Sequence, residues 1–293
     1  MARILLAGTA TLDLVFGLDH PPGADEEMRA QSLRICRGGN AANSAVVLGR
    51  LGHQAEFLGV LADAPETAVI ERDFTAHGVA FANCPRLPGR PPTSSIYLSG
   101  DNRSIVHYRD LPELDTETLL SLDLADYDWL HLEGRNVEVL AEVLPDLRNR
   151  FPALPVSLEL EKPRQGIEAL YAQADVLLCS RGFALYHGHE TAESFLQWIS
   201  GNAAHAMITA AWGAAGAYGR STEGRVVHAP AVRLERVVDA LGAGDTFNAG
   251  MIDALLREHS LQEALVHGCS LAGRKCSTHG FDFLDRCKKT TTT

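Results

Sequence analysis

The sequence predicts an α/β protein: a mostly parallel central sheet covered by helices on both faces, with a small antiparallel sheet attached as a lid. Short runs that are apolar on both faces alternate with helical patterns along the chain, as in a parallel sheet buried between helices. Two stretches, about residues 14–38 and 93–109, break that rhythm. The second contains Gly100–Asp101–Asn102 between alternating segments, which is typical of a hairpin tip.

The individual elements follow from these runs in chain order. Buried strands are expected at residues 2–10, 55–62, 129–134, 156–161, 176–180 and 206–213. Helices are expected over residues 40–52 and 65–78, where apolar residues recur at helical spacing. Ser260 and Glu263 have the spacing of a capping box, so a further helix is expected to begin there.

The composition is ordinary for a soluble globular protein that can bury a sizeable core. The chain has 293 residues, of which 46% are hydrophobic and 22% are charged. The net charge of −11 leaves no excess of Lys and Arg to neutralise phosphates, which argues against a general nucleic-acid binder. A local basic pocket for a small anionic ligand is still compatible with this charge.

Two further features indicate a cytoplasmic protein without membrane contact. Six cysteines are scattered without a CxxC pair, which is typical of thiols in a reducing compartment. No run approaches the roughly 18 apolar residues of a membrane helix, and Asp13 interrupts the first apolar run. A first strand therefore explains that run better than a signal peptide does.

The stretch VVDALGAGDTFNAGMIDALL, residues 237–256, predicts an anion site with an acidic group beside it. Gly242, Ala243 and Gly244 directly precede Asp245, where an apolar helical pattern begins. Amides at a helix start have no partner within the helix and can converge on a phosphate. The Asp245 carboxylate is then placed to take a proton from an attacking hydroxyl. The simpler alternative is a glycine-rich turn whose Asp is favoured by the helix dipole alone.

Polar residues also stand out near the N-terminus. In CRGGNAANSAVVLGRLG, residues 36–52, Asn40 and Asn43 are three apart and so lie on one helix face. Amides donate and accept, as a hydroxyl-rich ligand requires. Asp13 is expected at the carboxyl end of the first strand, where open α/β sheets bind ligands. The alternatives are a helix cap for Asn40, a solvated side chain for Asn43 and a turn residue for Asp13.

These stretches together resemble the PfkB (ribokinase-like) family of carbohydrate kinases. GGNAANSAVVLGRLG and DALGAGDTFNAG are similar to its N-terminal and C-terminal signatures, in the same order. Four further segments resemble its ketohexokinase (fructokinase) branch: HLEGRN at 131–136, LELEKPR at 158–164, TAAWGAAGA at 209–217 and AGRKCSTHGFD at 272–282. The resemblance runs from the first strand to Asp282. It implies a doubly wound sheet with a β-lid, in a single kinase domain over residues 1–293.

The resemblance also assigns residues to roles. Asp245 matches the catalytic base, and the anion hole matches Gly242, Ala243 and Gly244. The sugar-binding positions of the family match Asp13, Gly39, Asn40 and Asn43. Arg103 matches an arginine that reaches phosphate from the lid, and Lys162 a lysine near the nucleotide. The loop that holds ATP matches Ala211, Trp212, Gly213 and Gly216.

The implied activity is transfer of the γ-phosphoryl group of ATP to a hydroxyl of a ketohexose such as fructose. Mg²⁺ is the implied cofactor, because phosphoryl transfer relies on a metal to offset triphosphate charge. The implied assembly is a homodimer paired through the lids. Two departures are visible: Ala240 follows Asp239 where many members have Thr, and SRGF at 180–183 stands where others have Asn-x-x-Glu. The sequence therefore names no protein ligand for the metal.

Three alternatives stay open. The first is a kinase of the same family for ribose, a nucleoside, a keto-deoxy sugar acid or a sulfosugar. The second is a dinucleotide-dependent dehydrogenase, which would have GxGxxG after an early strand, where this chain has GTATLD. The third is a non-catalytic protein that senses a sugar or nucleotide, and the intact Asp245 argues against it.

Overall fold

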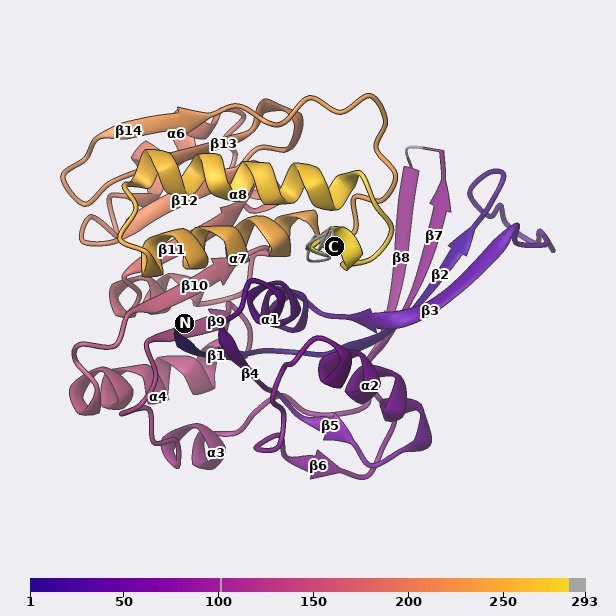
Figure 1. The fold of residues 1–293 in the computed structure, drawn as a ribbon, viewed down its shortest axis with the longest axis horizontal. Helices are drawn as coiled ribbons and strands as arrows, with labels where there is room; N and C mark the ends of the chain where they lie inside the picture. The colour runs from indigo at the N-terminus through magenta and orange to yellow at the C-terminus, as the bar shows by residue number, and fades with distance from the viewer. Residues whose placement is uncertain (101, 285–293) are drawn as a thin grey trace, which may run out of the picture.

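The described part of the chain, residues 1–100 and 102–284 of this computed structural model, is built on an eight-stranded sheet (Figure 1). The strand order is β14-β13-β12-β11-β10-β9-β1-β4. Their bounds are β1 Arg3–Ala7, β4 Gln54–Leu58, β9 Trp129–Glu133, β10 Val156–Leu160, β11 Val176–Ser180, β12 Met207–Ala211, β13 Ala217–Arg220 and β14 Val226–Ala229. All neighbours from β4 to β12 pair in parallel, and β13 and β14 add an antiparallel edge. The predicted α/β class is confirmed.

A second, four-stranded sheet forms the predicted lid and projects from the main body (Figure 1). Its order is β3-β2-β7-β8, with bounds β2 Thr11–Gly17, β3 Ser32–Gly38, β7 Thr93–Ser99 and β8 Asn102–Tyr108. Two antiparallel pairs are joined by a parallel β2–β7 pair in the middle. The expected hairpin joins β7 to β8, although Asp101 at its tip lies outside the described residues.

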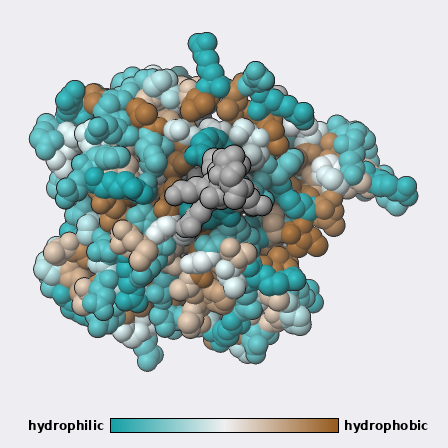
Figure 2. Space-filling model, in the orientation of Figure 1, coloured by the Kyte–Doolittle hydropathy of each residue, from teal (hydrophilic) through white to brown (hydrophobic). Residues whose placement is uncertain are grey.

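The two faces of the lid differ in character because side chains alternate along each strand. Side chains such as Asp13, Ile96 and Arg103 share the face that lines a deep cavity. The opposite, outer face is apolar, and it includes Ile35 with 52% and Val106 with 62% of its surface exposed. Figure 2 shows hydrophobic surface on the lid, at the right of the view.

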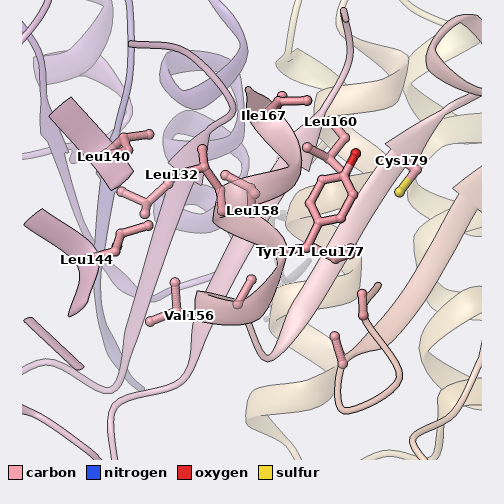
Figure 3. Close-up of a cluster of buried hydrophobic side chains, with 14 of the residues drawn as sticks. Leu132, Leu140, Leu144, Val156, Leu158, Leu160, Ile167, Tyr171, Leu177 and Cys179 are labelled. Carbon is pink, nitrogen blue, oxygen red and sulfur yellow. The ribbon is translucent and has the colours of Figure 1, made fainter. Parts of the chain in front are cut away.

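Helices cover both faces of the main sheet and enclose two separate cores. On one face lie α1 Asn40–Arg50, α7 Ala243–Leu256 and α8 Leu261–Cys276. On the other lie α3 Thr116–Leu120, α4 Val137–Arg150, the 3₁₀ segment Ile167–Gln173, α5 Arg181–Tyr186 and α6 Ala192–Ile199. Strand alternation divides the cores, so that Ile4 and Leu6 enter the first and Leu5 enters the second. Figure 3 shows the second core, where Leu158 and Tyr171 meet.

The remaining elements lie beside the lid. Helix α2 Ala68–Ala76 follows a short 3₁₀ turn and packs against β3. Two-residue strands β5 Leu61–Ala62 and β6 Arg86–Leu87 pair in parallel nearby. Helix α8 begins with the predicted capping box, in which Ser260 and Glu263 each accept from the other's backbone N–H. None of the helices in the described ranges is long and apolar enough to cross a membrane.

The first apolar run contains two strands where the sequence predicts one. Strand β1 ends at Ala7, and a turn through Gly8 carries the chain into lid strand β2. The prediction that Asp13 ends the first strand is therefore wrong, and the lid begins at residue 11, ahead of the predicted residue 14. The turn packs tightly: a Cβ on Gly39, whose φ is +99°, would lie 1.9 Å from the Thr9 carbonyl oxygen. The backbone at the start of α1 therefore packs directly against the turn between β1 and β2.

Helix α7 is anchored at the end remote from the lid by a buried carboxylate. Asp253 accepts hydrogen bonds from His53 at 2.8 Å and from Arg257 at 2.9 Å, and it pairs with His267 at 2.8 Å. Burial alone would raise the pKa of Asp253, but these partners outweigh burial and hold the pKa well below its usual range. The cluster ties α7 to α8 and to the turn before β4, which positions the first turn of α7.

Candidate active site

A cavity of about 610 Å³ lies between the lid and the carboxyl ends of the central strands. Its floor includes Thr9 after β1, Glu133 at the end of β9, and Glu159 and Glu161 at the end of β10. Strand β1 is the point where the strand order reverses, since the chain goes first to β4 and later to β9 on its other side. Open α/β sheets bind ligands at such a position.

Most of the residues that the sequence singled out line this one cavity. They are Asp13, Gly39, Asn40, Asn43, Arg103, Lys162, Ala211, Gly242, Ala243, Gly244 and Asp245. Three residues of the expected nucleotide loop, Trp212, Gly213 and Gly216, lie just beyond the lining, in the segment that follows Ala211. Lys162 forms an ion pair with Glu161 at 3.8 Å.

The first turn of α7 leaves backbone amides open to the cavity. Gly242 is the residue before the helix and has a φ of +78°, a left-handed conformation that favours glycine. Within residues 1–100 and 102–284, the N–H groups of Gly242, Gly244 and Asp245 donate no hydrogen bond. The N–H of Ala243 donates to the Ala240 carbonyl at 3.3 Å. The turn therefore offers unpaired donors at the positive end of the helix dipole, as an oxyanion requires.

The Asp245 carboxylate lies in the same turn and is buried, with only 8% of its residue surface exposed. Its Oδ2 accepts a hydrogen bond of 2.5 Å from Asn43 Nδ2, while its Oδ1 accepts none from the described residues. Burial raises the pKa of Asp245 to about 7, although the Asn43 hydrogen bond opposes the shift. A carboxyl group with this pKa can take up and release a proton near neutral pH.

The two asparagines of α1 hold different carboxylates. Asn43 is buried and bonded, so the alternative of a solvated side chain is wrong. The residue before α1 is Gly39, so Asn40 is not the helix cap. Asn40 Nδ2 donates to Glu159 at 3.2 Å and to Glu161 at 3.1 Å, which turns its amide oxygen away from both carboxylates.

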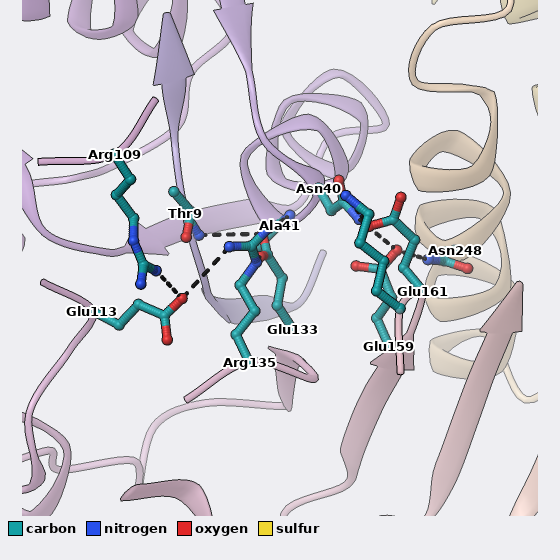
Figure 4. Close-up of polar contacts among 11 residues, drawn as sticks. Thr9, Asn40, Ala41, Arg109, Glu113, Glu133, Arg135, Glu159, Glu161 and Asn248 are labelled. Atoms are coloured by element: carbon teal, nitrogen blue, oxygen red, sulfur yellow. Dashed lines mark hydrogen bonds and ion pairs between the residues drawn. The ribbon is translucent and has the colours of Figure 1, made fainter. Parts of the chain in front are cut away.

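The buried glutamates of the cavity floor, Glu133 and Glu159, have no role predicted from the sequence (Figure 4). Glu133 accepts from the Thr9 and Ala41 amides at 3.2 and 2.8 Å. It also pairs with Arg135 at 2.7 Å. Glu159 accepts from Asn248 at 3.1 Å and has a buried Oε2 without a partner in the described ranges. Acidic residues inside the predicted strands at 129–134 and 156–161 are the signal that could have identified them.

Burial and nearby negative charges destabilise the ionised forms of these two glutamates at the cavity floor. Burial raises the pKa of Glu133 despite the Arg135 guanidinium. Burial raises the pKa of Glu159 well above its usual range, and the negative charges of Asp245, Glu133 and Glu161 add to the shift. The chain can relieve this crowding by keeping a proton on the cluster or by binding a cation beside it.

The loop ahead of α7 compensates for the missing threonine at Ala240. Asp239 accepts from Leu241 N at 3.0 Å, and its carbonyl accepts from buried Lys275 Nζ at 2.9 Å. Arg34 of the lid donates to Asp239 Oδ2 at 3.1 Å. Burial would raise the pKa of Asp239, but Lys275 and these hydrogen bonds lower it. The loop is therefore held without a hydroxyl at residue 240, and the same contacts connect it to the lid.

The described side chains form no group of three or more His, Cys, Asp or Glu arranged to hold a metal ion. A site of the magnesium type needs fewer protein ligands, since Mg²⁺ is usually bound through one or two carboxylates with waters and phosphates. Glu159 and Glu161 offer such oxygens on the cavity floor.

A deep cleft at the carboxyl edge, with open amides and a titratable carboxylate in one helical turn, has the groups that phosphoryl transfer requires. The family model described as pfkB family carbohydrate kinase matches residues 1–285. The chain belongs to this family, and it is a carbohydrate kinase that uses an alcohol group as acceptor.

Known relatives cover almost the whole chain. Ketohexokinase from Mus musculus is 35% identical, over 96% of this chain and 98% of that protein. The ATP-dependent ribose-1-phosphate kinase from Halopiger xanaduensis is 27% identical, over 94% of this chain and 93% of that protein. The structure of Arabidopsis thaliana ribokinase complexed with ribose and ATP has a TM-score of 0.79 at 19% identity. It covers 97% of this chain and 99% of that chain, and it shows the same fold.

We expect Asp245→Asn to stabilise the fold at pH 8. A carboxyl whose folded pKa is raised contributes stability while it is protonated and loses it as pH rises through about 7. The neutral variant avoids this loss, so its free energy of unfolding should exceed that of the wild type by on the order of 1–3 kcal/mol. Urea unfolding at pH 8 and at pH 5 measures it. An advantage that does not shrink at the lower pH would contradict the raised pKa.

Proposed function

We propose that this protein transfers the γ-phosphoryl group of ATP to a hydroxyl of a ketohexose such as fructose. The observation that carries the proposal is a buried carboxylate with a pKa of about 7 beside unpaired helix-start amides. Similarity to mouse ketohexokinase over nearly the whole chain supports the choice of a ketohexose.

The chemistry follows from the positions of these groups. Asp13, Gly39 and Asn40 line the part of the cavity between the lid and α1, where they would hold the sugar hydroxyls. Asp245 would take the proton of one hydroxyl as that oxygen attacks the γ-phosphorus. The bond between the γ-phosphorus and the bridging oxygen then breaks, and ADP leaves. The unpaired amides of Gly242 and Gly244, which flank Ala243, would bind the phosphoryl oxygens during the transfer.

The nucleotide would lie along the segment after β12. Ala211 lines the cavity, and Trp212, Gly213 and Gly216 form the adjoining turn. Arg103 on the lid and Lys162 after β10 both line the cavity and would approach the phosphates. Mg²⁺ is part of the proposal: the unpartnered oxygen of Glu159 and the neighbouring Glu161 fit a hard cation. When bound, the ion offsets the charge of the triphosphate.

The decisive experiment is a panel of acceptors with Mg²⁺–ATP, read by release of ADP. Ketoses should give the highest kcat/KM, above aldoses, nucleosides, keto-deoxy sugar acids, sulfosugars and ribose 1-phosphate. Preference for another acceptor would overturn the ketohexose. Tight sugar binding by calorimetry with no ADP from any acceptor would favour a sensing protein.

We expect Asp245→Asn to lower kcat by about 1,000-fold, because general-base catalysis typically contributes 10²–10⁴-fold. Sugar and nucleotide affinities measured by calorimetry should change little, since the amide keeps the size of the carboxylate. In the wild type, kcat/KM should fall as pH drops below about 7, because the base must be ionised to accept a proton. Turnover near the wild-type rate would refute the role of Asp245.

We expect Arg103→Ala to weaken nucleotide-dependent steps more than sugar binding. Arg103 stands on lid strand β8 and faces the cavity, and its side chain forms no hydrogen bond or ion pair with another described residue. Removing one charge-assisted contact to phosphate should raise the KM for ATP by about 10-fold. Calorimetric titrations with sugar and with an ATP analogue measure the two affinities separately. Equal losses for both ligands would count against this role.

The outer face of the lid fits a second copy of this chain, as a homodimer through the lids requires. The face carries Leu33, Ile35, Val106 and Tyr108, each about half exposed or more. In a two-fold dimer the same patch of both copies meets, so these apolar side chains would be buried against their equivalents.

We expect the wild type to be a dimer at micromolar concentration and Ile35→Asp to be a monomer, as measured by light scattering after gel filtration. In a symmetric dimer each copy would bury one introduced carboxylate in the interface, so the desolvation cost would be incurred in both copies. Tyr218→Phe, on the main sheet, is the matched control and should stay dimeric. A monomeric wild type would contradict this assembly.

A further inference from the structure

Arg37, in lid strand β3, is buried next to the active site although neither its position nor its charge suggested a role. Its side chain is only 1% exposed. It lies over the rings of Phe74 and Phe281, at 5.7 and 5.3 Å from their centroids. A charged side chain enclosed in this way needs hydrogen-bonding or charged partners that offset the free-energy cost of removing it from water.

Those partners are found on two helices. Arg37 Nη1 donates to Asn43 Oδ1 at 2.5 Å, and Arg37 Nε donates to Asp73 Oδ2 at 2.5 Å. Asp73 belongs to α2, and Asn43 belongs to α1, one turn from Gly39. One guanidinium thus bridges strand β3 to both helices.

The hydrogen bond from Arg37 fixes the orientation of the Asn43 side-chain amide. A guanidinium has donors and no acceptor, so only the amide oxygen of Asn43 can face Arg37. The amide nitrogen then faces Asp245, where it donates to Oδ2 at 2.5 Å. Asp245 Oδ1, which accepts nothing from the described residues, is left for the substrate. A reversed amide would present its oxygen to the carboxylate and repel it.

We propose that Arg37 is a positioning residue: it orients Asn43 so that the amide fixes Asp245 with one carboxylate oxygen free for the reacting hydroxyl. This inference rests on the kinase reaction proposed above. The positive charge of Arg37 also favours the ionised form of Asp245, which lowers its pKa against the effect of burial. Because Arg37 lies in a lid strand, a displacement of β3 would also disturb the base.

Two variants separate this role from a structural one. Arg37→Met keeps the stem over the rings and removes the donors. Asp73→Asn removes the charge of the other partner while keeping an oxygen that can accept from Arg37 Nε. A purely structural role predicts similar effects of both variants on stability and turnover. The positioning role predicts that Arg37→Met alone lowers kcat, by about 10- to 100-fold, with little change in the KM for sugar.

A double-mutant cycle tests whether Arg37 acts through Asn43. The double variant Arg37→Met/Asn43→Ala should turn over no more slowly than Asn43→Ala alone, because the second change removes a contact that is already lost. Arg37→Lys, which keeps the charge and one donor position, should recover part of kcat. Additive losses in the cycle would overturn the proposal.

Spectroscopy gives a readout that does not depend on turnover. In a proton–nitrogen spectrum, the Asn43 side-chain amide is identified by its disappearance in Asn43→Ala. Its bonded proton should be shifted strongly downfield in the wild type and in Asp73→Asn, and less so in Arg37→Met. An unchanged signal in Arg37→Met would refute the role of Arg37 even if no acceptor is phosphorylated. Suppose that Arg37→Met changes the chemical shift of the Asn43 amide proton but the wild type releases no ADP with any acceptor. The proposed kinase reaction is then refuted, whereas the orientation of Asn43 by Arg37 is supported.

Discussion

The buried carboxylate of Asp245, in the first turn of α7, is the constraint on which the rest of the site depends. The same turn carries unpaired amides and a buried carboxylate whose pKa is raised to about 7. Glu133 and Glu161 nearby oppose ionisation, while Asn43 and Arg37 favour it. Helix α1, strand β3 and helix α7 therefore have to meet at one point, and the close approach at Gly39 is what allows them to do so.

The two halves of the fold contribute different parts of the cavity. The main sheet supplies a floor of buried side chains, held by backbone amides and by Arg135, that cannot move without opening a core. The lid supplies a wall of alternating residues that Arg34 and Arg37 connect to the loop before α7 and to α1. Because these two arginines reach Asp239 and Asn43, the lid is connected to the loop before α7 and, through Asn43, to Asp245. A binding site that must exclude water gains from this coupling.

The asparagine pair shows why spacing alone underdetermines a role. Asn40 and Asn43 lie on one helix face, as their spacing predicts. Asn40 is turned toward Glu159 and Glu161, which leaves its oxygen for a ligand hydroxyl. Asn43 uses its oxygen on Arg37 and its nitrogen on Asp245, so both ends of its amide are bonded within the protein. The partners of each amide come from strands and helices far along the chain.

The sequence by itself determined the glycine-rich turn and most of the central strands, because periodicity and backbone freedom are local properties. Apolar runs predicted β9, β10 and β11 to within a residue, whereas α7 begins at Ala243, two residues ahead of the predicted Asp245. The sequence did not predict α4, α6, β13 or β14. Only the tertiary structure decided that Asp13 belongs to the lid, that Glu133 and Glu159 crowd the floor, and that Arg37 donates to Asn43. Burial, pKa and amide orientation arise from groups that are distant in sequence, and no pattern within a single segment contains them.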